Sequence, residues 1–348
     1  MSVRAPVLET RGLTVTFGGT GRVALFGRRE PVAAVSDVSI SVKPGQTLAL
    51  VGESGSGKST TARAICGLVP YRGEVMFSGL SARVLERDGT AAGHRQMVFQ
   101  DPYSSLDPLM TVGESIVEPI HLRAGRGNVD GSRLAELLDA VRLPMSYASR
   151  LPSELSGGQR QRIAIARALA TEPALVICDE ALSALDASTQ GEVLSILREL
   201  RDVRGLSFLF IAHDLAVVRH LADEVAVMYL GSIVETGPTE TVFRDPKHPY
   251  TQALLESAPI PHPRLQRARR RLTIVRGEPP DPSRRPTGCS FHPRCPLAID
   301  ICRTDPPPLE ESGERSVACH VNRVGAPTRP AAGYSEPGGS ARIEGISK

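Results

Sequence analysis

Short apolar runs alternate with amphipathic stretches along the first part of the chain. The run QTLALVG precedes the helical pattern KSTTARAICGL, and ALVICDE precedes QGEVLSILRELRDV. Strand patterns that alternate with helical patterns are typical of a mostly parallel sheet covered by helices, so this order predicts an α/β fold. From Gln100 to the segment LSGGQ the pattern is helical only, which predicts a helical subdomain inserted at about residues 101–164.

The character of the chain changes after EVAVMYLGSIVETG, which is typical of a closing hairpin. Proline becomes frequent from Pro246 to Pro308, and four of the six cysteines follow the extended stretch PPDPSRRP. We therefore divide the chain into a core of residues 1–238, a linker and regulatory segment of residues 239–285, a small cysteine-containing segment of residues 286–324 and a tail of residues 325–348 that is expected to be disordered.

Composition limits the kinds of partner. No stretch approaches the roughly 18 apolar residues of a membrane span, and the start MSVRAPVLET lacks the apolar core of a signal peptide, so we expect a cytosolic protein. The net charge of +3 allows approach to anionic surfaces without requiring it. Aromatic residues make up 4% of the chain and Trp is absent, so we expect no nucleic-acid partner.

The sequence GESGSGKST follows an apolar strand and precedes a helix, which is the context that a phosphate-binding loop requires. Its backbone N–H groups would converge on the β-phosphate, Lys58 would reach the β- and γ-phosphate oxygens, and the Ser59 hydroxyl would bind Mg²⁺. The residues predicted to bind ATP in this loop are Gly52, Ser54, Gly55, Ser56, Gly57, Lys58, Ser59 and Thr60.

Three further strand-like runs end in polar residues suited to hydrolysis. Asp179 and Glu180 close LVICDE, where Asp179 suits hydrated Mg²⁺ and Glu180 suits a general base. His213 follows LFIA and could hydrogen-bond the γ-phosphate and the attacking water. Gln100 ends RQMVFQ, and its amide could contact Mg²⁺ or the water.

A second anion-binding helix start appears at LSGGQRQRIAIARAL, where Ser156 and two glycines precede an amphipathic helix. With the phosphate loop, Gln100, LVICDE, SALD and His213, in this order and spacing, the chain resembles the nucleotide-binding subunit of an ATP-binding-cassette (ABC) transporter over about residues 7–240. The resemblance implies a phosphate-loop NTPase core of ABC type, in which two subunits face each other head to tail.

The same resemblance assigns the second helix start to the partner's nucleotide. Ser156, Gly157, Gly158 and Gln159 would then bind ATP in trans, so that each ATP lies between two chains. The resemblance also implies an aromatic residue stacked on adenine. Phe17 is at the expected position, and its other interpretation is a core residue of a strand.

Three stretches resemble the ATPases of dipeptide, oligopeptide and nickel importers: FQDPYSSLDPLMTVGESIVEPI, HPYTQALLESAP and GCSFHPRCPLAIDIC. This implies peptide as the cargo, with nickel as the alternative. It also implies a second ATPase subunit, two transmembrane permeases, an extracytoplasmic peptide-binding protein and a peripheral place on the cytoplasmic face of the membrane. A soluble ABC ATPase that acts outside transport is the alternative in another class, and a redox or metal sensor built on the cysteines is a third.

The cysteines Cys289, Cys295, Cys302 and Cys319 have the spacing C-x5-C-x6-C-x16-C, which lacks the short pairs that zinc prefers. The segment resembles the importer branch in which four thiolates hold a [4Fe–4S] cluster. Zinc and free thiols remain alternatives. Because the segment lies beyond the linker, we expect its loss to leave ATP binding at Lys58 intact.

Overall fold

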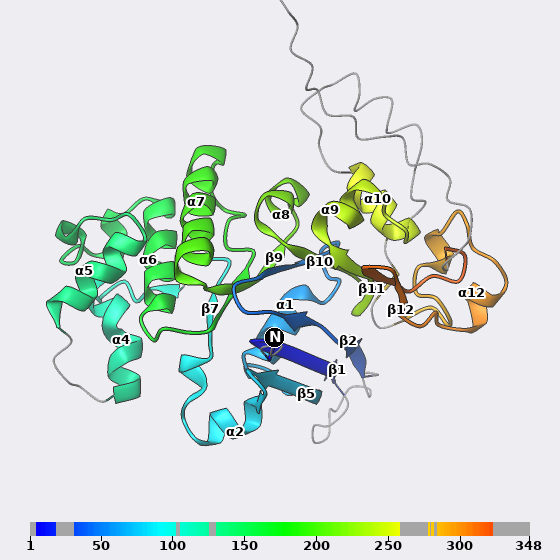
Figure 1. Ribbon diagram of the computed structural model, residues 1–348, viewed down its shortest axis with the longest axis horizontal. Helices are drawn as coiled ribbons and strands as arrows, with labels where there is room; N and C mark the ends of the chain where they lie inside the picture. Colours follow the sequence, from blue (N-terminus) through cyan, green and yellow to red (C-terminus); the bar gives the residue numbers. More distant parts are fainter. Residues whose placement is uncertain are drawn as a thin grey trace, which may run out of the picture.

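The computed structural model describes residues 5–18, 31–101, 105–124, 130–257, 278, 280–281 and 284–322. These residues form two sheets (Figure 1). The smaller sheet is antiparallel, with its strands in the order β2-β1-β5-β6 and β3 also paired with β1. Its strands are β1 (Leu8–Phe17), β2 (Val32–Val38), β3 (Ser41–Val42), β5 (Arg72–Phe77) and β6 (Leu80–Ser81).

The larger sheet has the order β12-β13-β11-β10-β4-β9-β8-β7. The run β10-β4-β9-β8-β7 is parallel, and β11, β13 and β12 continue it in antiparallel fashion. The strands are β4 (Thr47–Val51), β7 (Arg95–Val98), β8 (Leu175–Asp179), β9 (Ser207–Ala212), β10 (Glu224–Tyr229), β11 (Ser232–Pro238), β12 (Glu310–Ser312) and β13 (Arg315–Val317). The α/β fold with a mostly parallel central sheet is confirmed.

The parallel strands are continuous apolar runs because both faces of the sheet are buried. In β4, Ala49 and Val51 belong to one hydrophobic cluster, while Leu48 and Leu50 belong to the other. The second cluster also takes in residues of the smaller sheet and of α1 (Lys58–Ile65).

The remaining helices cover the sheets and build the inserted subdomain. Those associated with the sheets are α2 (Ala82–Arg87), α7 (Ala187–Arg204), α8 (Leu215–Leu221), α9 (Thr239–Arg244), α10 (Pro249–Ser257) and α12 (Ile301–Thr304). Between β7 and β8 lie α4 (Val112–Ala124), α5 (Gly131–Ala140) and α6 (Gly157–Leu169), and Figure 1 shows them together at one end of the molecule. Short 3₁₀ turns occur at Ala91–Gly93, Met145–Tyr147, Pro152–Glu154 and His292–Arg294.

The cysteine-containing segment is joined to the large sheet. Val317 of β13 pairs with Glu235 of β11, and the Ala318 N–H donates to the Val234 carbonyl over 2.9 Å. Phe291 is 1% exposed and belongs to the main hydrophobic cluster. The segment therefore shares the core of the preceding residues. The four-part division of the chain itself stays a prediction, and the tail lies outside the described residues.

In the part of the chain that the structure describes, no helix combines the length and apolar character needed to span a bilayer.

Candidate functional site

The predicted site residues lie at one edge of the large sheet. β4 leads into the phosphate loop, β8 into Glu180, β9 into His213, and β7 lies close before Gln100. Because these strands are parallel neighbours, their carboxyl ends bring the four loops to the same edge.

The phosphate loop has a backbone that only glycine fits at two positions. Gly52 has φ +155° and Gly57 has φ +105°. A Cβ atom would stand 2.2 Å from the Met228 carbonyl oxygen at Gly52, and 2.4 Å from the Ala34 carbonyl oxygen at Gly57. The glycines thus leave the loop backbone free to curve ahead of α1, as a phosphate cradle requires.

Lys58 is buried and is held by the loop that precedes it. Its ammonium donates to the carbonyl oxygens of Gly52 and Glu53 over 2.9 and 2.8 Å. Burial lowers the pKa of Lys58, and the carboxylates of Glu180 and Asp179 oppose that shift. The ammonium is therefore placed where an anion in the loop would meet it.

Ser59 and Asp179 meet beside the phosphate loop. The Ser59 hydroxyl donates to Asp179 Oδ1 over 2.7 Å. Burial raises the pKa of Asp179, and the hydrogen bond from Ser59 opposes this shift. A hydroxyl and a carboxylate are the oxygen ligands that Mg²⁺ accepts, so this pair fits the predicted metal contact.

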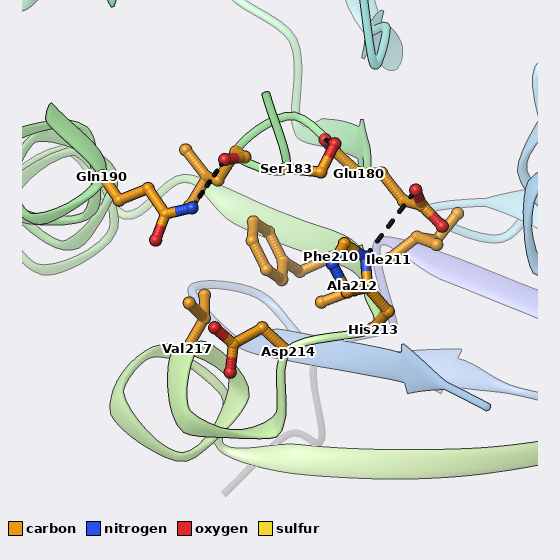
Figure 2. A pocket seen from close by; sticks show the side chains of 10 residues that line it. Glu180, Ser183, Gln190, Phe210, Ile211, Ala212, His213, Asp214 and Val217 are labelled. Atoms are coloured by element: carbon orange, nitrogen blue, oxygen red, sulfur yellow. Dashed lines mark hydrogen bonds and ion pairs between the residues drawn. The ribbon is translucent and has the colours of Figure 1, made fainter. Parts of the chain in front are cut away.

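Glu180 is held between two polar side chains. Gln100 Nε2 donates to Glu180 Oε2 over 3.0 Å, and His213 Nδ1 lies 3.8 Å from the same oxygen. Figure 2 shows the side chains of Glu180 and His213 directed toward each other. The backbone of Glu180 has φ +48°, in the left-handed region that residues other than glycine seldom adopt. The structure thus brings all the predicted hydrolytic residues together.

The predicted trans residues stand apart at the start of α6. Ser156 Oγ accepts from the Gln159 N–H over 3.3 Å, and Gln159 Oε1 accepts from the Ser156 N–H over 2.9 Å. This reciprocal pair is a capping box, which the sequence pattern S-x-x-Q could have indicated. A Cβ atom on Gly158 would stand 2.1 Å from Thr189 Cγ2, so close packing on α7 also requires glycine there. Ser156 is exposed, as contact with a second chain requires.

Phe17 ends β1 and its side chain is 47% exposed. The remaining ATP-loop residues Ser54, Gly55, Ser56 and Thr60 lie on the loop and the first turn of α1. Of the stretches that carry the resemblance to importer ATPases, residues 102–104 and 258–259 lie outside the described residues.

Two contacts to the phosphate loop were missed by the sequence analysis. The Glu53 N–H donates to the Tyr250 hydroxyl over 2.8 Å, and the Arg294 guanidinium donates to both carboxylate oxygens of Glu53 over 3.0 and 3.2 Å. Tyr250 belongs to the stretch HPYT and Arg294 to CSFHPRC. Both stretches were singled out only as marks of resemblance.

The four cysteines of the C-terminal segment carry free thiols and lie within electrostatic reach of one another. Burial raises the pKa of Cys295 to about 11, and the charges of Cys319, Cys289 and Cys302 add to this rise. The Asn322 N–H donates to Cys319 Sγ over 3.5 Å. Among the described residues, however, no three His, Cys, Asp or Glu side chains are gathered as ligands of one metal ion. Thiols are the ligands that an iron–sulfur cluster requires. In the described residues, however, they are not arranged as a preformed set of ligands.

Cys178 is buried in the core, and Cys66 is a partly buried residue that packs against it. Burial raises the pKa of both thiols to about 12. Such thiols are protonated at neutral pH and unreactive.

Comparisons with known proteins agree with this geometry. A family model described as "ABC transporter" matches residues 35–183, and one described as "Oligopeptide/dipeptide transporter, C-terminal region" matches residues 234–302. The chain is 50% identical to a probable peptide ABC transporter ATP-binding protein of Sinorhizobium fredii, over 85% of this chain and 84% of the relative. It is 45% identical to the oligopeptide transport ATP-binding protein OppF of Escherichia coli, over 91% of this chain and 96% of the relative.

Among solved structures, the chain resembles a dimeric post-hydrolysis state of the ATP-binding cassette MJ0796 bound to ADP and Pi. The TM-score is 0.57 at 29% identity, and the match covers 67% of this chain and 98% of the other. The chain therefore belongs to the ATP-binding subunits of ABC transporters and is an ATPase of that family.

Proposed function

We propose that this ATPase powers the import of peptides through partner membrane permeases. The names of its relatives support peptide as the cargo, and so does the match to the C-terminal region of oligopeptide and dipeptide transporters. The observation that carries the ATPase part is the meeting of Ser59, Asp179 and Glu180 at the carboxyl edge of the sheet.

Each side chain at this edge has a defined task in the proposal. The loop N–H groups and Lys58 bind the phosphates, and Ser59 and Asp179 hold the Mg²⁺ that neutralises charge on them when it is bound. Glu180 accepts a proton from the attacking water. Gln100 and His213 fix the carboxylate of Glu180 from two sides, and either can also contact the γ-phosphate end of the site.

The second half of each ATP site is proposed to come from a partner cassette. The start of α6 offers the positive end of a helix dipole to an anion, while the capping box engages the N–H groups of Ser156 and Gln159 within the chain. Ser156 is exposed and its hydroxyl bonds only weakly, over 3.3 Å, within its own cap. In a mixed dimer, Ser156→Arg in one subunit should disable the site that contains the other subunit's Lys58. Loss of ATP crosslinking only to the subunit that carries the mutation would contradict the trans arrangement.

We infer that the permeases dock on the groove between β7, α4 and α6. A cavity of about 340 Å³ lies there and is lined by Phe99, Leu122 and Arg167 among others. Phe99 is 41% exposed and Leu122 is 80% exposed, which is the apolar character expected of a contact with another protein. The proposed complex contains two permeases, a second cassette and an extracytoplasmic peptide-binding protein. Docking of this subunit on the permeases would place it at the cytoplasmic face of the membrane.

A transport assay tests the cargo. In cells that lack this gene, the wild-type chain should restore uptake of labelled oligopeptides, and Glu180→Gln expressed to the same level should not. Restoration of nickel uptake without peptide uptake would show that the cargo is wrong while leaving the ATPase assignment intact.

We also propose that Cys289, Cys295, Cys302 and Cys319 hold a [4Fe–4S] cluster. Support comes from the four thiol donors within one short segment, and from the backbone hydrogen bond by which the Cys289 N–H donates to the Cys302 carbonyl oxygen over 2.9 Å and brings two of these residues side by side. Anaerobic purification should give a brown protein with about four irons per chain, and each Cys→Ser change should remove the colour. A colourless protein with one zinc and no iron would refute the cluster.

A further inference from the structure

The outer side of the phosphate loop is held by residues from the last third of the chain. Arg294 donates from Nη1 and Nη2 to the two carboxylate oxygens of Glu53, over 3.0 and 3.2 Å. The Tyr250 hydroxyl accepts a hydrogen bond from the backbone N–H of Glu53 over 2.8 Å. One residue of the loop is therefore fixed through both its side chain and its backbone.

The ion pair is shielded from water. The side chain of Arg294 is 8% exposed and that of Glu53 is 32% exposed. Two parallel N–H···O bonds also fix the plane of the Arg294 guanidinium relative to the plane of the Glu53 carboxylate, which a single hydrogen bond cannot do. This pair should therefore hold Glu53 more firmly than an exposed surface pair would.

A buried aromatic cluster fixes the two residues that hold Glu53. The rings of Tyr229, Tyr250 and Phe291 lie 4.6 to 5.5 Å apart between centroids, and each is 1% exposed. The Arg294 guanidinium lies 5.9 Å from the ring centroids of both Tyr229 and Phe291. The cluster joins β10, α10 and the cysteine-containing segment into one support below the loop.

We propose that Arg294 and Tyr250 are positioning residues for ATP binding, which hold Glu53 so that the loop is shaped for phosphate before ATP arrives. The apparent affinity of such a loop is its intrinsic affinity multiplied by the fraction of molecules in which the loop is already ordered, so any change that lowers this fraction weakens binding. The prediction that loss of the cysteine-containing segment leaves ATP binding intact stays a prediction, and the proposal implies the opposite result, because Arg294 stands between Cys289 and Cys295 and contacts the loop directly.

The test uses the full-length chain and a fluorescent ATP analogue. Arg294→Ala should weaken equilibrium binding by roughly 10-fold or more, with about 150-fold as the upper limit that a hydrogen bond between charged groups allows. Tyr250→Phe removes only the hydroxyl and should weaken binding by a smaller factor of about 3 to 10. Arg303→Ala is the matched control, because Arg303 is an exposed arginine of the same segment, and it should bind as the wild type does.

Two further measurements separate positioning from general damage. In the assembled transporter, KM for ATP should rise with Arg294→Ala while kcat stays within about twofold, since Glu180 and His213 lie on other loops. Arg294→Ala should also add little to the effect of Glu53→Gln, because both changes remove the same contact.

Unchanged nucleotide affinity in Arg294→Ala, fully additive effects with Glu53→Gln, or a fall in kcat at constant KM would each overturn the proposal. If Arg294→Ala does not fold, Tyr250→Phe and Glu53→Gln, checked for an unchanged melting temperature, decide the question by themselves. The binding measurement uses the chain alone, so its result does not depend on which cargo is transported.

Discussion

The assignment of Glu180 as general base is the prediction that the site geometry allows us to work out most fully. Glu180→Gln preserves the shape of the side chain, and the new amide oxygen can still accept from Gln100 Nε2, now 3.0 Å from the carboxylate. The change removes only the capacity to take a proton. ATP binding, which depends on Lys58 and Ser59, should therefore stay within about threefold of the wild type, whereas turnover should fall by roughly 10²- to 10⁴-fold.

The size of the effect distinguishes a base from a structural residue. A fall of 10²- to 10⁴-fold corresponds to about 2.7–5.5 kcal/mol in the barrier. Loss of one hydrogen bond is worth about 1 kcal/mol, or about fivefold in rate. The assay is steady-state ATP hydrolysis by the assembled transporter, beside nucleotide binding by the isolated chain.

A matched control and a refuting result complete this test. Glu199→Gln changes an exposed glutamate of α7, paired with Arg142, and should leave hydrolysis unchanged. Hydrolysis by Glu180→Gln within about tenfold of the wild type would refute the assignment, and His213 would then be the next residue to examine.

Three further predictions follow from backbone strain, a buried histidine and the aromatic cluster. In nucleotide-binding assays Gly57→Ala should abolish ATP binding, because its Cβ would stand 2.4 Å from a carbonyl oxygen. Gly55→Ala meets no atom within 4 Å, so it adds only the backbone strain of its φ of +77° and should cost less affinity. Burial lowers the pKa of His248 from 6.5 to about 3, so the unfolded chain alone takes up the proton below pH 6.5. The unfolding free energy should thus fall as the pH drops, by about 2 kcal/mol at pH 5. Urea titrations at several pH values should show a smaller fall in unfolding free energy for His248→Asn than for the wild type. Phe291→Ala should lower the unfolding free energy by about 3–5 kcal/mol in the same assay, and an effect under 1 kcal/mol would contradict its place in the core.

The parts of the site that could be predicted from the sequence are those that local pattern determines. Asp179 and Glu180 close an apolar strand, and the loop before Lys58 lies between a strand and a helix, so each position follows from a few neighbouring residues. Parallel strands then bring these ends to one edge without further information. The capping box at Ser156 was equally local, and it was overlooked because the two glycines suggested only an anion site.

The support below the phosphate loop could not be predicted in this way. Arg294 and Glu53 are separated by 241 positions, and neither lies in a pattern that identifies the other. The pairing of β13 with β11 is likewise set by packing, because short strands of three residues carry little register information. The proline-rich composition before the cysteines predicted a segment separate from the ATPase core, whereas β13 of this segment pairs with β11 of the large sheet.

The edge of the large sheet gives a physical reason for that return. Without β13, β11 would present unpaired N–H and C=O groups at the end of the sheet, which other chains could pair with. The cysteine-containing segment has few apolar residues, so it cannot form a core alone, and it places Phe291 in the main hydrophobic cluster instead. This burial also anchors Arg294 three positions later, against Glu53. Loosening the segment from the sheet would therefore remove the contacts of Arg294 with Glu53, and under the proposal above ATP affinity should fall as this distant part of the chain loses its packing.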